Sequence, residues 1–133
     1  LDHLLEDWEK SNAKHFLEQL AKPGAPSRRL QRLVNLWMEE KNFDPRLEAA
    51  IRHWATIDGH VRERVHAVDR CRIAAIADIF IQDGRDQIEA EVRARILYFH
   101  QVGYYALDLG ETIELREKLM PHYTRIMAGF KDQ

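Results

Sequence analysis

Residues 49–80 read AAIRHWATIDGHVRERVHAVDRCRIAAIADIF, and apolar side chains recur at helical spacing on both sides of the Asp58-Gly59 pair. The inner face of the helix before this pair is predicted to carry Leu47, Ala50, Ile51 and Trp54. The stripe of the longer helix after it, which is expected to end near Gln82, is Val61, Val65, Val68, Ile76 and Ile79. Asp58 suits the N-cap of the longer helix, because its carboxylate can accept hydrogen bonds from the first turn. The stretch therefore predicts two amphipathic helices joined by a short turn.

Helical periodicity continues on both sides of this stretch. A first helix is expected over residues 2–21, before the breaker KPGAPS, with an apolar face of Leu4, Leu5, Trp8, Phe16, Leu17 and Leu20. Ser27 is expected to cap a second helix, whose apolar positions are Leu30, Leu33, Val34, Trp37 and Met38. Asp44 and Pro45 suit the start of a third helix, the one that ends before Asp58.

Two more helices complete the chain. Gly84 suits a left-handed position after the fourth helix, and Asp86 with Glu89 resembles a capping box for a fifth that runs to about Leu107. A sixth is expected from about residue 111 to about residue 129, kinked or split by Pro121. No strand-like alternation of useful length occurs, so the fold class is all-α, a six-helix bundle in one domain over residues 1–133.

The fifth helix is apolar on two sides. One row is Ile88, Val92, Ile96, Phe99, Gly103 and Ala106, and the other is Ala90, Ala94, Leu97, Tyr98 and Tyr105. A helix that is apolar nearly all round is buried on several sides, which in a domain of this size indicates contact with a second subunit.

Composition narrows the class of protein. The chain has 133 residues, a net charge of −2 and a single cysteine, Cys71. It is therefore not a basic nucleic-acid binder as a whole, and it has neither an internal disulfide nor a multi-cysteine metal site. No apolar run is long enough to span a membrane and no signal peptide is present, so a cytoplasmic location and no membrane partner are expected. Because an apolar helical stripe begins at Leu1, the native product is expected to extend upstream.

The stretch quoted above resembles the effector domain of the TetR/AcrR family of bacterial transcriptional regulators. The matching positions are Ile51, Arg52, Trp54, Ala55, Asp58, Val61, Val65, Val68, Asp69 and Arg72. The following EAEVRARILYFHQVGYYAL resembles the penultimate helix of that family, and the similarity extends over about residues 28–130.

The resemblance implies an orthogonal helical bundle that dimerises through its last two long helices, which form a four-helix interface. It also implies a pocket for a small, often apolar or aromatic effector, whose binding alters operator affinity. The family's N-terminal helix-turn-helix domain is absent from this chain, and residues 1–21 would form the helix that connects to it. Operator DNA is thus an expected partner only of the intact protein.

Candidate residues follow from these patterns. Asp69 and Arg72 lie on or beside the valine and isoleucine stripe, where a lone charge is costly, so an ion-pair tie is predicted among Arg52, Asp69 and Arg72. A ligand-binding or catalytic carboxylate, or simple solvent exposure, remains an alternative for these groups. The candidate pocket lining is Trp37, Met38, Trp54, Arg64, Tyr98 and Gln101. The candidate dimer interface is Ile96, Phe99, Gly103, Ala106, Tyr123, Ile126 and Met127.

Nothing in the sequence supports catalysis. No histidine pair has the spacing of two metal ligands on one helical face, and no nucleophile motif or phosphate-binding loop is present, so no metal and no cofactor are expected. The preferred interpretation is a ligand-sensing, dimerising domain of a TetR-like regulator. The alternatives are a stand-alone helical dimerisation or small-ligand-binding module without DNA binding and, third, a small all-α enzyme.

Overall fold

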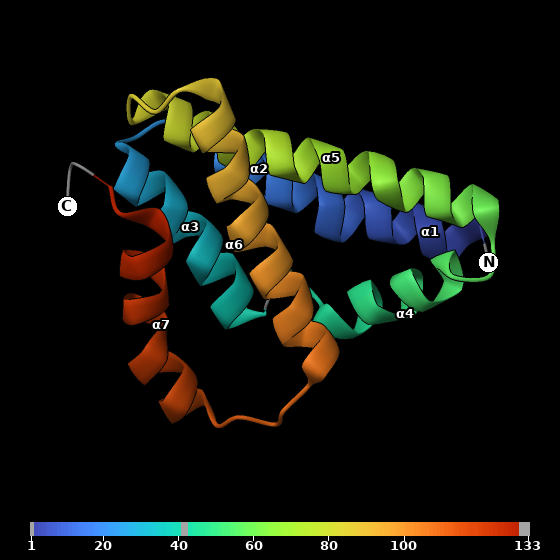
Figure 1. Cartoon of the computed structure of the whole chain (residues 1–133). Coiled ribbons are helices and arrows are strands. Elements are labelled where there is room, and N and C mark those ends of the chain that lie inside the picture. The colour runs from blue at the N-terminus through green and yellow to red at the C-terminus, as the bar shows by residue number, and fades with distance from the viewer. Residues whose placement is uncertain (1, 41–42, 131–133) are drawn as a thin grey trace.

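The computed structural model describes residues 2–40 and 43–130, and every regular element in these ranges is a helix (Figure 1). The elements are α1 (Asp2–Trp8), η1 (Glu9–Ala13), α2 (Lys14–Ala21), α3 (Pro26–Glu39), α4 (Pro45–Ala55), α5 (Gly59–Gln82), α6 (Gln87–Leu107) and α7 (Ile113–Ala128). The π-helical η1 continues α1 into α2 without a break. When α1, η1 and α2 are counted as one long helix, the described residues form six helices and no strand. This confirms the all-α bundle.

Three helices begin at the N-cap residues that the sequence predicts. The Asp44 carboxylate accepts from the N–H groups of Arg46 and Leu47, and Pro45 takes the first helical position. Asp58 and Asp86 cap α5 and α6 in the same way, as expected. Gly84 has a φ of 90°, in the left-handed region expected after α5.

Three expectations at helix ends need correction. Ser27 is not the N-cap of α3, because that helix begins two residues earlier than such a cap would place it, with extended Ala25 at the N-cap and Pro26 at the first position. The last helix begins at Ile113, and its cap is Thr112, whose hydroxyl accepts from the Leu115 N–H. The capping box is only half formed, since the Glu89 carboxylate pairs with Arg85.

The π-helical segment changes the register of the first helix. Besides Ala13, the buried positions are Leu5, Trp8, Asn12, Phe16 and Leu20, whose spacing is slightly wider than the 3.6 residues per turn of an α-helix. Leu4 and Leu17, expected on the inner face, are exposed. The wider turn keeps one buried line along the whole helix and places the polar Asn12 at its centre.

Helix α5 runs the length of the molecule, with the long first helix beside it, as Figure 1 shows. One end of α5 contributes Val61 and Val65 to a small hydrophobic cluster with Leu5, Trp8 and Ile51. The other end contributes Ile76, Ile79 and Phe80 to the main core, which also includes residues of α2, α3 and α6. Asp69 and Arg72 lie between the two clusters, so the core is divided by a polar layer halfway along α5.

Helix α7 continues through Pro121 without a break, so of the two expected effects, a kink or a split, the split does not occur. Its C-terminal end is held by Arg85 and Arg93, which donate to backbone carbonyls of residues 127–129. Phe130 then packs on Phe80, with ring centroids 5.1 Å apart. No helix within the described ranges is both long enough and apolar enough to cross a membrane.

Candidate functional site: a cavity beside a buried ion-pair network

The two charged residues of the described chain that are buried as whole residues form one pair between α4 and α5. The Arg72 side chain is 1% exposed, and its Nη2 lies 2.7 Å from Oε1 of Glu48, which is itself 5% exposed as a residue. A second bond joins Arg72 Nη1 to Glu48 Oε2 at 3.1 Å. This bidentate geometry matches the planar guanidinium to the carboxylate. The rings of Trp8, Phe16 and Phe43 surround the same guanidinium, with centroids 4.9–5.5 Å from its central carbon.

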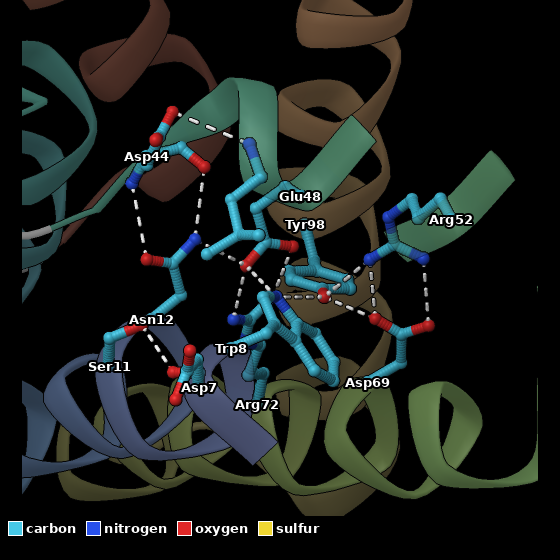
Figure 2. A network of polar contacts seen from close by, with 11 residues as sticks. Asp7, Trp8, Ser11, Asn12, Asp44, Glu48, Arg52, Asp69, Arg72 and Tyr98 are labelled. Atoms are coloured by element: carbon cyan, nitrogen blue, oxygen red, sulfur yellow. Dashed lines mark hydrogen bonds and ion pairs between the residues drawn. The ribbon is translucent and has the colours of Figure 1, made fainter. Parts of the chain in front are cut away.

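A second ion pair lies beside the first, as Figure 2 shows. Arg52 Nη2 is 2.6 Å from Asp69 Oδ1, and Nη1 is 3.0 Å from Oδ2. The Tyr98 hydroxyl joins the two pairs: it donates to Asp69 and accepts from both Arg52 and Arg72. The structure thus brings Arg52 and Asp69 together, the tie expected between these helices, whereas Arg72 pairs with Glu48 and not with Asp69.

The network also holds the first helix. Glu48 Oε1 accepts from the Trp8 indole N–H at 2.8 Å and from the Asn12 amide at 3.3 Å. Asn12 further donates to the Asp44 carbonyl at 3.0 Å and accepts from the Asp44 N–H at 3.2 Å. In Figure 2, this set of bonds connects α1 and η1 with α4 and α5. The position of the N-terminal helix is therefore fixed by the same carboxylate that neutralises Arg72.

Electrostatics keeps these groups in fixed protonation states. Burial favours neutral forms, but the Glu48 carboxylate outweighs it and raises the pKa of Arg72. The pKa of Asp69 is lowered, because the hydrogen bond and charge of Arg52 outweigh its burial. Burial raises the pKa of Tyr98 to about 12. Near neutral pH Arg52 and Arg72 are therefore cations, Asp69 is an anion and Tyr98 is neutral, while the Glu48 carboxylate offsets Arg72 in the bidentate pair.

A cavity of about 160 Å³ lies beside the network, between α3, α4, α5 and α6. Its apolar and aromatic lining is formed by Trp37, Phe43, Ala49, Tyr98, Val102, Tyr105 and Ala106. The remaining lining residues are Glu48, Arg52, Arg72 and Gln101, yet nearly all of the wall surface is carbon, because the charged atoms face one another. Ala49 and Ala106 are exposed, so this side of the cavity reaches the surface between α4 and α6.

Half of the candidate pocket residues line this cavity and half do not. Trp37, Tyr98 and Gln101 lie in its wall. Met38 packs instead against the main core, Trp54 packs against the small cluster, and Arg64 pairs with Glu9 of η1. Each residue lies on its expected helix, but Met38 is turned to the main core, whereas Trp54 and Arg64 lie further along their helices, near the small cluster and η1.

Sequence reasoning missed Glu48, although a signal was present. Glu48, Ile51 and Ala55 share one face of α4, and all three are buried. A carboxylate among apolar positions at helical spacing is the same signal that drew attention to Asp69 and Arg72. Phe43 and Tyr105 were also missed, because a loop residue and a second tyrosine carry no distinctive pattern.

Helix α6 has one buried and one exposed apolar row. Ala90, Ala94, Leu97 and Tyr98 are buried within this subunit. On the other row, Ile96 is 51% exposed and Phe99 is 53% exposed, and Ile88 and Val92 of the same row are also exposed. Among the described residues, the Arg95 guanidinium lies over the Phe99 ring, and the four apolar side chains of the row that was expected to meet a second subunit are all exposed.

The remaining candidate interface residues differ in their exposure to solvent. Ile126 is largely exposed, and, apart from the adjoining backbone of α6 itself, no described residue lies within 4 Å of the position that a Cβ would take at Gly103. Tyr123 is half-buried against His100, with ring centroids 4.9 Å apart, and Met127 packs on the main core. Ala106 is exposed but flanks the cavity.

No cluster of three or more histidine, cysteine or carboxylate side chains that could hold a metal ion occurs in residues 2–40 and 43–130. The chain matches no protein-family model, no curated protein and no solved structure, so its resemblance to TetR-like effector domains rests on its own residues alone.

Proposed function

We propose that this chain is the ligand-sensing and dimerising domain of a TetR-like, DNA-binding transcriptional regulator of the cytoplasm. In the intact protein, binding of a small molecule would alter operator affinity by favouring one arrangement of the dimer over another. No catalytic step is part of this proposal.

The observation that carries the proposal is the shared role of Glu48 and Arg72. Both residues line the cavity, and Glu48 also bonds Trp8 and Asn12 of the first helix. In the family that the sequence resembles, this helix leads to the DNA-binding domain. A molecule in the cavity would therefore contact the residues that fix the helix through which a signal would have to pass.

The exposed row on α6 supports dimerisation. Exposed apolar side chains at Ile88, Val92, Ile96 and Phe99 form a continuous stripe along one helix face, and Ile126 of α7 adds a further exposed apolar side chain. A two-fold axis can pair such a stripe with its own copy, which would remove the apolar surface of both copies from water.

Dimerisation is tested by the sedimentation of the 133-residue chain and of Ile96→Glu. We expect a dimer for the parent chain and a monomer for the variant, because two unpaired carboxylates would be buried in the interface. Ile57→Glu is the matched control, since Ile57 is 79% exposed in the turn between α4 and α5, away from α6, and this variant should remain dimeric. A parent chain that stays monomeric at high micromolar concentration would contradict this part of the proposal.

The DNA-binding part is tested with the native gene. Its coding sequence upstream of Leu1 should specify a basic three-helix segment that includes a helix-turn-helix, and the intact product should bind DNA from its own promoter region. A gene that encodes no such segment would instead favour a stand-alone ligand-binding or dimerisation module.

A further inference from the structure

We propose that the ligand of the cavity is an uncharged molecule the size of one aromatic ring, and that the cavity rejects anions of the same size. This inference rests on the proposed function insofar as the cavity is the effector site. It adds the size and the charge of the effector, which the function itself leaves open.

The volume of the cavity limits the size of its ligand. The cavity volume is about 160 Å³. An apolar protein cavity of about 150 Å³ holds a benzene molecule, so there is room for one ring with a small substituent and not for a fused, multi-ring compound. The wall contains the rings of Trp37, Phe43, Tyr98 and Tyr105, and such rings favour edge or offset contacts with an aromatic guest.

The ion pairs in the cavity wall disfavour a charged ligand. The two arginines that line the cavity are both engaged in bidentate pairs, Arg72 with Glu48 and Arg52 with Asp69. Among the described residues the Arg72 Nε–H has no hydrogen-bond partner, but Glu48 already neutralises this guanidinium, so an anion that accepted from it would bring an uncompensated charge into the interior. A cationic ligand meets the same obstacle with the signs reversed, because the four charges already cancel.

The cavity wall also offers a polar side chain to a neutral ligand. Gln101 is buried in the lining and is its only uncharged polar side chain other than the tyrosines. Its amide hydrogen-bonds the Tyr105 hydroxyl and has further donor and acceptor capacity, so one hydroxyl on the ligand can be accommodated there without disturbing the ion pairs. The tyrosine hydroxyls are less suited to this role: Tyr98 is bonded to Asp69, and Tyr105 donates to the Trp37 carbonyl.

The test compares benzyl alcohol with benzoate, which share a ring and one carbon but differ in charge at neutral pH. Each compound is titrated into the ¹⁵N-labelled chain, and backbone amide shifts are followed by NMR. We expect saturable shifts around Phe43, Gln101 and Val102 with benzyl alcohol, and binding of benzoate weaker by about tenfold or more because its charge would be buried unpaired. Equal or tighter binding of benzoate would overturn the inference, as would an absence of saturable shifts in the lining with benzyl alcohol.

Two substitutions connect binding to this cavity. Ala49→Phe places a ring at the exposed side of the cavity and should reduce the affinity for benzyl alcohol by about tenfold or more by occupying the ligand's volume. Ala50→Phe, one residue further along α4, exposed and outside the lining, should leave the affinity unchanged. Val102→Phe, from the α6 side, should repeat the effect of Ala49→Phe. If both lining variants bind as the parent does, the inference is wrong.

These outcomes are separate from those of the proposed function. Dimerisation and DNA binding are measured without any ligand, so they can fail while the cavity still selects neutral rings. Conversely, a preference for benzoate would leave dimerisation and DNA binding intact and would remove only the assignment of the ligand class.

Discussion

The carboxylate of Glu48 accepts hydrogen bonds from three side chains that belong to three different segments: Trp8 of α1, Asn12 of η1 and Arg72 of α5. Each of these side chains is buried, so none of them can turn to water if the carboxylate is lost. A single residue of α4 thus joins the first helix to the central helix. Buried polar groups with several partners are costly to disturb, because every partner left unpaired retains its desolvation penalty.

We expect Glu48→Gln to lower the free energy of unfolding by about 3–5 kcal/mol, the range found when one partner of a buried ion pair is removed. Guanidinium denaturation followed by circular dichroism measures the change. Glu18→Gln is the matched control, since its pair with Lys14 is exposed on both sides and should contribute less than about 0.5 kcal/mol. Equal losses in the two variants would show that Glu48 does not neutralise a buried cation.

At the scale of elements, η1 is the least regular part of the first helix. Its π-helical turn places Asn12 against the start of α4, where the amide bonds both the N–H and the carbonyl of Asp44. Ordinary helical geometry would shift the later buried residues, Phe16 and Leu20, around the helix axis. The wider turn therefore satisfies two demands at once, the contact with α4 and the burial of α2.

Asn12→Ala is expected to loosen this segment more than the rest of the fold. Removal of the amide leaves the part-buried N–H of Asp44 without its acceptor, at a cost of about 1–3 kcal/mol, whereas the Asp44 carbonyl still accepts from the Glu48 N–H. Hydrogen exchange of the backbone amides in residues 8–14 should accelerate more than exchange in the middle of α5. Asn35→Ala, the same substitution at an exposed position of α3, should change neither rate. Uniform acceleration in both segments of the Asn12 variant would contradict a local role.

At the scale of the whole molecule, the two hydrophobic clusters lie at opposite ends of α5 and the ion-pair network lies between them. Four charges in the interior make the stability of the whole fold depend on their ionisation. The pKa of Asp69 is held below its ordinary value, with Arg52 outweighing the effect of burial. A depressed carboxyl pKa stabilises the folded state at neutral pH, and this contribution is lost as pH falls below the unfolded value of about 4.

The difference in unfolding free energy between the parent chain and Asp69→Asn should therefore be largest near neutral pH. It should narrow as the pH is lowered from about 5 to about 3, since protonation of Asp69 in the parent chain removes what the substitution has already removed. Urea denaturation at a series of pH values measures both curves. A gap that stays constant over this range would mean that the Asp69 charge does not stabilise the fold.

The sequence by itself determined the helical class, most helix ends and the charged positions on the inner faces. Asp44, Asp58 and Asp86 cap their helices because a cap depends on residues within one turn of it. The two apolar rows of α6 are likewise readable from helical spacing, and the structure buries one row and exposes the other. Asp69 and Arg72 could be recognised as needing partners, because a charge on an apolar stripe is unfavourable alone.

Only the tertiary structure decided which partners those charges found. Glu48 and Arg72 are separated by 24 residues, and Asn12 and Asp44 by 32, so no local pattern selects either pair. The Asn12–Asp44 contact is made from the π-helical turn, which changes the register of the residues after it, so the exposure of Leu17 could not be judged from helical spacing. The cavity depends on the angles at which α3, α4, α5 and α6 cross, which is why Trp37, Tyr98 and Gln101 face it while Met38, Trp54 and Arg64 do not. Local interactions fix where helices begin, whereas long-range packing fixes how each helix is rotated, and the candidate site depends on that rotation.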